Sequence, residues 1–241
     1  MQIINRPSPN RTSGRQGQIP DFIVCHITGG SFTSAINTIT NPASQVSYHF
    51  VVNREGTVAQ SVDISDTAWA NGTTINGDNR DNHHSTIPQI RSRRLNANQF
   101  TISIGFADST SGELSAVQLL AGVDLLMYIL AYVRNLYGFD IPLARTNIIG
   151  HHEVNPITRP FCPGPRFPFE ELITRAREIS LVKYQNEIIP PIQPNNPSPW
   201  AKDAWNWGTL LGLTDGTSPQ GIPTREQMIT LLHRYHLSEN M

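Results

Sequence analysis

Short apolar runs, each bounded by turn-forming residues, divide the first three quarters of the chain into candidate strands. Residues 21–27 (DFIVCHI) are almost wholly apolar, which is typical of a buried strand. Residues 100–106 (FTISIGF) alternate apolar and polar side chains, as the two faces of a strand require. Similar runs predict strands over residues 46–53, 57–62 and 146–150, with a hairpin turn at Glu55 and Gly56.

Helical spacing marks three other stretches. Ser115 is a typical N-cap with Gln118 as its capping-box partner, and Gly138 ends the helix predicted between them. Its apolar positions are Leu119, Leu120, Val123, Leu126, Met127, Leu130, Val133 and Tyr137. Shorter helices are predicted over residues 31–39 and 169–181. Strands and helices interleaved in this order predict an α/β domain, with a central mixed β-sheet flanked by helices.

Prolines separate a smaller C-terminal part from this domain. Five prolines between Pro190 and Pro199 can neither continue a helix nor pair within a central strand. We therefore expect one globular domain over residues 1–183, an extended linker over 184–199 and a small helical module over 200–241.

Charge and composition narrow the functional class. The 18 basic and 19 acidic side chains give a net charge of −1, so no overall field favours nucleic acid or an anionic membrane. No apolar run approaches the ~18 residues of a membrane span, and residues 1–20 lack the apolar core of a signal peptide. The two cysteines cannot form a disulfide scaffold. We expect a soluble protein made in a cytoplasm.

One long segment, residues 66–98, shows no periodicity and is expected to be a loop. A loop of this length in a compact domain is usually functional or mobile. Its arginines, Arg91, Arg93 and Arg94, form either a solvated face or a contact with an anionic polymer. His83 and His84 are neighbours whose side chains should point in different directions, which argues against a shared metal site.

Residues that could hold a metal lie at the ends of two predicted strands and in a proline-rich loop. They are His26, one of His151 and His152, and Cys162. Two imidazoles and a thiolate suit Zn²⁺, and three protein ligands leave a fourth position for water, as in catalytic sites. The alternative is a hydrogen-bonded core histidine and a cysteine that packs as a small apolar side chain.

Four stretches resemble the zinc-dependent N-acetylmuramoyl-L-alanine amidases, a family that includes phage amidase-lysozymes, bacterial wall amidases and peptidoglycan recognition proteins. They are FIVCHITGG, SYHFVVNREGTVAQSVDISDTAWANG, FTISIGF and IIGHHEVNPITRPFCPGPRFPF. They occur in the family's order and cover about residues 20 to 175. The resemblance implies that His26, His151 and Cys162 are the zinc ligands. Alternation along a strand also favours His151 over His152, because neighbouring side chains point to opposite faces.

The resemblance also assigns roles around the metal. Tyr48 would orient the reacting water or donate to the tetrahedral intermediate, and His49 would then face away as a structural residue. Many bacterial members carry a general-base glutamate near positions 105–107, where this chain has Gly105, Phe106 and Ala107. Members that use the tyrosine also lack this glutamate.

Further candidates surround the last predicted ligand. Arg159 could stabilise the oxyanion or be an ordinary surface arginine. Thr158 beside it and Trp69 are expected to contact the substrate, although Trp69 could instead be a core residue. Glu153 is expected to be structural, because the order of residues is not His-Glu-x-x-His. Cys25 should face the opposite side of its strand, into the core.

The tail, residues 200–241, resembles one S-layer-homology repeat, a module that binds wall polymers. One copy buries little surface alone, so it should pack on the larger domain or pair with another copy as a homodimer. The sequence thus predicts an amidase that acts on Gram-positive peptidoglycan, with secondary wall polymer as a further partner.

Without a signal peptide, a phage endolysin made in the host cytoplasm and acting at the wall is expected. The alternatives are a bacterial autolysin with the same chemistry and a non-catalytic peptidoglycan-binding protein.

Overall fold

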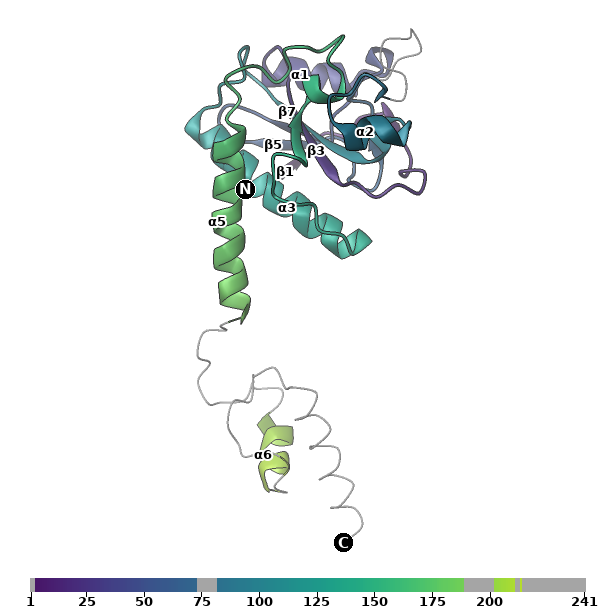
Figure 1. Cartoon of the computed structure of the whole chain (residues 1–241). Coiled ribbons are helices and arrows are strands. Elements are labelled where there is room, and N and C mark those ends of the chain that lie inside the picture. The colour runs from purple at the N-terminus through teal and green to yellow at the C-terminus, as the bar shows by residue number, and fades with distance from the viewer. Residues whose placement is uncertain (1–2, 73–81, 189–201, 211–212, 214–241) are drawn as a thin grey trace. The chain divides into compact units, whose positions relative to one another are not determined.

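A computed structural model describes residues 3–72, 82–188, 202–210 and 213 (Figure 1). The strands are β1 (Ile3–Asn5), β2 (Arg11–Thr12), β3 (Phe22–Ile27), β4 (Phe50–Val52), β5 (Val58–Gln60), β6 (Thr67–Ala68), β7 (Thr101–Phe106) and β8 (Ile148–Gly150). The α-helices are α1 (Phe32–Thr40), α2 (Pro88–Arg93), α3 (Ala116–Tyr137), α4 (His151–Val154), α5 (Phe169–Ile188) and α6 (Lys202–Leu210).

Six strands form one mixed sheet in the order β1-β5-β4-β7-β3-β8. In this order the four neighbouring strands β4, β7, β3 and β8 are mutually parallel, whereas β5 is antiparallel to β4. In the register of β3 and β7, His26 lies opposite Gly105. The sheet and its flanking helices confirm the predicted α/β architecture.

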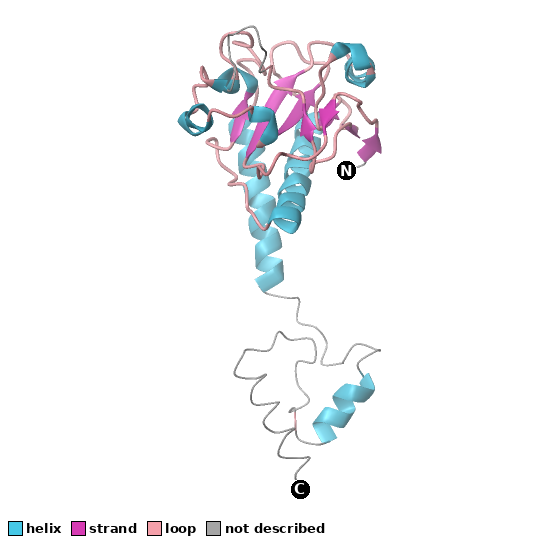
Figure 2. Ribbon diagram, turned by 90° about the vertical axis from the view of Figure 1, so that its right-hand side faces the viewer, coloured by secondary structure: helices cyan, strands magenta, loops and turns pink. Residues whose placement is uncertain are grey.

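Apolar side chains alternate between the two faces of the sheet and determine which helices cover each face (Figure 2). Ile23 and Cys25 of β3 belong to the cluster that contains the apolar residues of α3 and α5. Phe22 and Val24 pack with Ile90 of α2 and Val154 of α4 on the other face. By this alternation His26 faces the side covered by the short helices, whereas Cys25 lies in the main core, as predicted.

The central helix α3 differs from the prediction in three details. Ser115 caps it by accepting from Gln118 N at 3.0 Å, but the Gln118 side chain donates to the carbonyls of Val52 and Ala107 instead of completing a capping box. Leu120, predicted as an apolar contact, is 51% exposed. Of the described helices, only α3 is long and apolar enough to cross a membrane, contrary to the sequence expectation. Half of its apolar window is buried within the fold, as in a core helix.

Several short elements were not predicted. The strands β1, β2 and β6 and the helix α2 lie in segments interpreted as polar termini or loops. Conversely, the strand predicted over residues 46–53 is ordered as β4 only from Phe50, so Tyr48 precedes it. The strands β1, β2 and β6 have only two or three residues each, too few to show an apolar periodicity.

The N-terminal segment is held by a buried arginine. Arg15 is 4% exposed, and its guanidinium donates to the carbonyls of Ile64 at 2.6 Å and of Gln99 and Thr101 at 3.0 Å. Burial lowers the pKa of Arg15 to about 10, although the group remains charged at neutral pH. These bonds connect three distant segments under the start of β7.

The chain divides into two compact units, Met1–Leu181 and Val182–Met241. The helix predicted over residues 169–181 is α5, which continues through Ile188. The linker predicted from residue 184 therefore begins inside this helix. In the second unit the structure describes α6, where Trp207 is 51% and Leu210 85% exposed. The prolines of the predicted linker and most of the predicted wall-binding module lie outside the described residues.

Candidate active site

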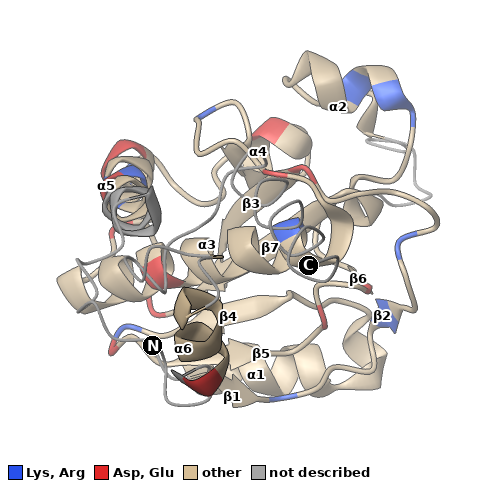
Figure 3. Cartoon of the chain, turned by 90° about the horizontal axis from the view of Figure 1, so that it is seen from below, with Lys and Arg blue, Asp and Glu red and all other residues tan. Residues whose placement is uncertain are grey.

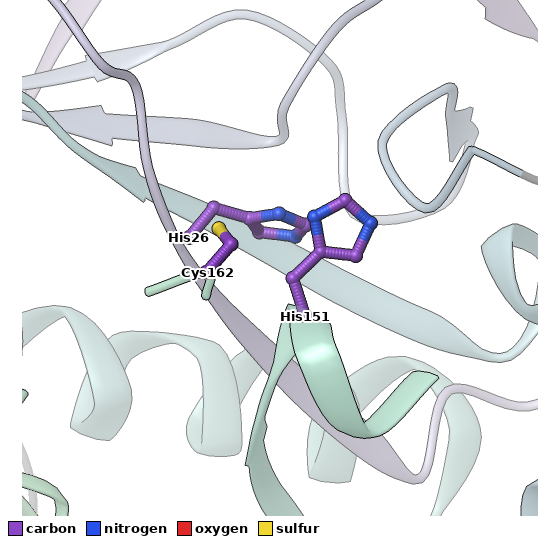
Figure 4. Close-up of side chains that lie close together, drawn as sticks. All are labelled: His26, His151 and Cys162. Carbon is purple, nitrogen blue, oxygen red and sulfur yellow. The ribbon is translucent and has the colours of Figure 1, made fainter. Parts of the chain in front are cut away.

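Three donor side chains from distant segments converge at the carboxyl ends of β3 and β8 (Figure 4). His26 lies on β3, His151 begins α4 directly after β8, and Cys162 follows in the next loop. One nitrogen of each imidazole and the Cys162 sulfur all lie within 4.8 Å of one another. The structure therefore brings together the three residues that the sequence predicts as metal ligands.

His152 supports this cluster without joining it. Its backbone N–H donates to the Cys162 carbonyl at 2.8 Å, and its ring Nδ1 lies 2.9 Å from the same oxygen. The prediction from the family resemblance thus chose the histidine that faces the other donors, but its supporting reason, alternation along a strand, was wrong. Both histidines lie in the first turn of α4, where neighbouring side chains diverge around a helix instead of alternating across a strand.

The imidazoles of the cluster are buried, neutral and short of partners. Both nitrogens of His26 and Nε2 of His151 make no hydrogen bond. Burial holds the pKa of His26 well below its usual value and lowers the pKa of His151 to about 4. Buried polar atoms without partners are rare in folded proteins, and neutral imidazole nitrogens are good ligands for Zn²⁺. The donor set and its orphaned nitrogens fit a bound zinc ion.

The third donor, Cys162, is held as a thiol in the absence of a cation. Burial raises its pKa to about 11, while the Ile27 N–H, 3.4 Å from the sulfur, and the Arg159 charge act in the opposite direction. A metal binds the thiolate, so its binding would release this proton. Cys25, the other cysteine, is fully buried in the main core and belongs to no disulfide.

Tyr48 lies against the cluster. Its ring centroid is 5.0 Å from that of His26 at a tilt of 55°. Burial raises the pKa of the Tyr48 phenol far above its usual value, and the nearby Cys162 adds to this effect. The hydroxyl therefore keeps its proton, and can donate a hydrogen bond, over the whole physiological pH range.

Arg159 is exposed, yet its charge acts on the three donors and on Tyr48. It lowers the pKa of His26, Tyr48, His151 and Cys162, in each case as a smaller cause than burial. Its guanidinium donates to the adjacent Thr158 carbonyl at 2.9 Å. Thr158 itself donates its backbone N–H to Asn155 Oδ1 at 3.2 Å. The loop that carries both residues thus lies beside the cluster.

Trp69 is half-buried and anchored at both ends. Its indole N–H donates to Thr12 Oγ1 at 3.0 Å, and its backbone N–H donates to Ser47 Oγ at 2.9 Å. The bond to Ser47 holds Trp69 beside the residue that precedes Tyr48. A contact between Trp69 and the substrate stays a prediction.

Glu153 and His49 have structural partners, as expected. Glu153 accepts from the Gly150 N–H and from Arg145, both at 2.7 Å. His49 Nδ1 accepts from the Ser103 N–H at 3.0 Å. Neither side chain belongs to the donor cluster.

The histidine pair His83 and His84 and the basic side chains of α2 do not belong to the donor cluster. The rings of His83 and His84 lie 4.2 Å apart, so the expectation of diverging side chains was wrong. Among the described residues no third donor groups with them. The basic residues of α2 stand out in Figure 3, but Arg93 pairs with Asp21 and stacks on Phe100. At least part of this basic run is structural.

A separate cavity of about 990 Å³ lies between the N-terminal segment and the end of β5. Its lining includes Pro7, Ser61 and Tyr128, and none of the three donor residues. It therefore contributes nothing to the site.

Sequence reasoning missed two asparagines beside the cluster. Asn155 is fully buried directly after α4, and its side-chain Nδ2 donates to the backbone carbonyls of Asn71, at 3.4 Å, and Gly72, at 3.1 Å. The only signal in the sequence is an asparagine three residues before Thr158, and this pattern is too common to be specific.

The sequence comparison identifies the family. Residues 16–165 match the family described as N-acetylmuramoyl-L-alanine amidase, termed Amidase_2. This match covers more than half of the chain and contains all three donors, so the chain belongs to this family of peptidoglycan amidases. No curated protein matches the sequence.

Solved structures share the fold. A mutant of PlyL is 18% identical, with a TM-score of 0.50, over 73% of this chain and 99% of that chain. The N-acetylmuramoyl-L-alanine amidase LysC from Clostridium intestinale URNW is 20% identical, with a TM-score of 0.48, over 73% and 98% of the two chains. At these identities the likeness to PlyL supports the amidase-type fold alone.

Proposed function

We propose that the chain uses Zn²⁺, held by His26, His151 and Cys162, to cleave the amide bond between N-acetylmuramic acid and L-alanine in peptidoglycan. The convergence of two neutral imidazoles, with three buried nitrogens that make no hydrogen bond, and one thiol carries this proposal. Three protein ligands leave a coordination position open, which is typical of catalytic rather than structural zinc. When bound, Zn²⁺ supplies a Lewis acid for the scissile carbonyl and acidifies water at neutral pH.

The side chains around the cluster supply the remaining chemistry. Tyr48 holds its proton on Oη, so it can donate a hydrogen bond to the developing oxyanion and pass a proton toward the leaving amine. Arg159 adds a permanent positive charge beside the site. Gly105, Phe106 and Ala107 carry no proton acceptor, which leaves Tyr48 as the acid–base residue of this proposal.

Trp69 and Thr158 are proposed to contact the substrate from two sides. Trp69 belongs to the segment that precedes residue 72, and Thr158 belongs to the loop between α4 and Cys162. Asn155 joins the two segments through its hydrogen bonds. Their relative position is therefore fixed before any substrate binds.

The decisive experiment measures the bond cleaved and the metal together. Purified cell walls from a Gram-positive bacterium are incubated with the full chain, and new amino groups and new reducing ends are counted separately. We expect one zinc per chain, and new amino groups that belong to N-terminal L-alanine, without new reducing ends. Cys162→Ala should lose both zinc and activity, whereas Cys25→Ala, the matched cysteine in the main core, should keep both.

Two results would contradict the proposal. A metal-free chain that still releases amino groups would exclude zinc catalysis. A chain that binds walls and zinc but releases no amino groups would favour the non-catalytic binding protein.

The biological setting is a further proposal. We propose that the protein is a phage endolysin that acts at the host wall, with residues 200–241 binding a wall polymer or a second copy of the chain. The exposed Trp207 and Leu210 of α6 offer apolar surface for such contacts. A bacterial autolysin would share the chemistry, so the test is whether a phage genome that lacks this gene fails to lyse its host.

A further inference from the structure

The cavity between the N-terminal segment and the end of β5 lies at the edge of the sheet opposite the metal cluster. Gln60, the last residue of β5, pairs with Phe50, the first residue of β4, because these two strands are antiparallel. Asn5 ends β1 and pairs with Gln60. The cavity is therefore at the amino ends of the parallel strands, whereas the donors lie at the carboxyl ends of β3 and β8. It is separate from the proposed active site.

Hydrogen bonds of the N-terminal segment fix the walls of this cavity. The backbone N–H of Ser8 donates to the Ser61 carbonyl at 2.8 Å, so the segment continues alongside β5 after β1 ends. Asn10, which is 2% exposed, donates through Nδ2 to the Asn41 carbonyl at 2.9 Å. The cavity of about 990 Å³ is thus formed before any ligand binds, and its size is that of a small-molecule site.

Two primary amides lie side by side in the lining. Asn5 and Gln60 are register partners in the parallel pair of β1 and β5, so their side chains project from the same face of the sheet. Val58, two residues before Gln60, belongs to the main core cluster, so this is the face that α3 covers. Neither amide makes a hydrogen bond with a described residue. Each therefore offers two N–H donors and a carbonyl acceptor to a ligand.

The charged groups of the lining are already bonded within the protein. Arg11 forms an ion pair with Asp66. Asp63 Oδ1 accepts from the Ser65 N–H at 2.8 Å and from Tyr132 Oη at 3.0 Å. Arg11 and Asp63 also leave the lining without net charge. The cavity therefore favours a neutral ligand over an anion or a cation.

Apolar groups face the same space. Pro7 and Pro9 contribute their rings from the N-terminal segment, and Tyr128 contributes its ring from α3. The Tyr128 ring packs edge to face on Phe50, with ring centroids 6.1 Å apart. Flat apolar groups beside free amides match a sugar ring, which has apolar C–H faces and a polar rim. The acetamido group of an N-acetylated sugar is itself an amide, so it can both donate to and accept from Asn5 or Gln60.

We propose that this cavity binds an N-acetylated sugar chain, the glycan of peptidoglycan, with Asn5 and Gln60 bonding an acetamido group and Tyr128 packing on a sugar ring. The sugar bound here is not the one whose amide is cleaved, because the metal cluster is at the other edge of the sheet. A second contact of this kind raises the overall affinity for the wall. The choice of peptidoglycan as the source rests on the proposed function, whereas recognition of an N-acetylated sugar chain does not.

The test uses the full chain and chitotetraose, a short chain of N-acetylglucosamine that contains no muramyl amide to cleave. Cellotetraose, which has hydroxyl groups in place of the acetamido groups, is the control ligand. An NMR titration gives the Kd and follows the side-chain amide signals of Asn5 and Gln60. The double variant Asn5→Leu/Gln60→Leu removes both amides and keeps bulk. Gln89→Leu, at an exposed glutamine of α2, is the matched control.

We expect chitotetraose to bind more tightly than cellotetraose and to shift both amide signals. The double variant should bind chitotetraose about 10- to 100-fold more weakly, as expected for two lost hydrogen bonds, and Gln89→Leu should bind like the wild type. If the double variant fails to fold, each single variant should weaken binding about 3- to 10-fold.

Three results would overturn the proposal: no binding of chitotetraose, equal affinity for cellotetraose, or wild-type binding by the folded double variant. The last result would place the sugar elsewhere on the chain. Chitotetraose binding that depends on both amides, in a chain that cleaves no wall amide, would support this site and reject the proposed amidase function.

Discussion

The ring of Tyr48 lies directly over Gly105 of β7. A Cβ atom at Gly105 would come within 3.0 Å of the Tyr48 ring and 3.1 Å of the Thr28 methyl group. The space above residue 105 is thus occupied by the tyrosine ring. Tyr48 can lie at the cluster because residue 105 has no side chain.

Gly105→Ala should therefore displace Tyr48 and lower kcat while leaving zinc bound. The physical reason is overlap, because strand and ring cannot both stay in place with an added methyl group. A double-mutant cycle with Tyr48→Ala checks this, since the effect of Gly105→Ala should largely vanish once the ring is gone. Equal losses in both backgrounds would show that the methyl group acts through Thr28 or the strand instead.

Tyr48→Phe should reduce kcat by about 10²- to 10⁴-fold, the usual contribution of a positioned acid–base group. The fold and the zinc content should not change, because the ring and its contact with His26 remain. Tyr137→Phe, on a tyrosine that packs against the main core at the end of α3, is the matched control. Turnover that is unaffected by Tyr48→Phe would make Tyr48 a packing residue.

Arg159→Gln should raise the pKa of the Cys162 thiol further in the metal-free protein, because the Arg159 charge that stabilises the thiolate is removed. At a fixed alkaline pH the rate of alkylation of Cys162 should then fall. The exposed Arg175 of α5 provides the control variant Arg175→Gln. If both variants are alkylated at the wild-type rate, Arg159 does not act on the site electrostatically.

The stability of the protein should fall as the pH drops below about 6.5, partly through His49. Burial holds the pKa of His49 well below its usual value, with the Arg15 charge as a second cause. Below pH 6.5 the unfolded chain takes up a proton that the folded chain refuses, which costs about 1.4 kcal/mol per pH unit. His49→Asn should remove this part of the slope in urea unfolding and leave the slope above pH 7 unchanged. An identical slope in the variant would exclude His49.

Removal of residues 189–241 should leave a folded, active amidase on soluble muropeptides. The cut follows α5, which continues to Ile188, so the helix stays intact. Binding to intact walls should weaken, because a tethered second contact raises the overall affinity. Wall pull-down and light scattering compare the two chains. Equal wall binding and an equal number of chains per particle would leave the tail with neither proposed role.

The sequence predicted an element correctly where the element's own apolar periodicity marks its buried face. β3, β7 and α3 were predicted from this periodicity, and the metal donors were predicted from the sequence motifs that contain His26, His151 and Cys162. It was uninformative where one segment is shaped by another. Tyr48 is set by the space above Gly105, and the segment of Asn71 and Gly72 is tied to the end of α4 by Asn155, so neither relationship leaves a periodic signal.

The same limit explains the wrong expectations. α4 has four residues, too few for a helical period, so the two histidines read as the end of a strand. The short strand β1 pairs in parallel with β5, and this pairing depends on residues more than fifty positions away. Local patterns cannot report such partners.

The place of β3 in the sheet has a consequence for how the protein is made. β3 leaves the ribosome before both of its neighbours, β7 and β8, which are encoded much later. At about 5–20 residues per second, translation leaves its two edges without partners for several seconds. The apolar FIVCHI segment therefore lacks its strand partners until the second half of the domain arrives. Because Cys162 emerges last of the three donors, the nascent chain completes its metal cluster only when nearly the whole domain has been synthesised.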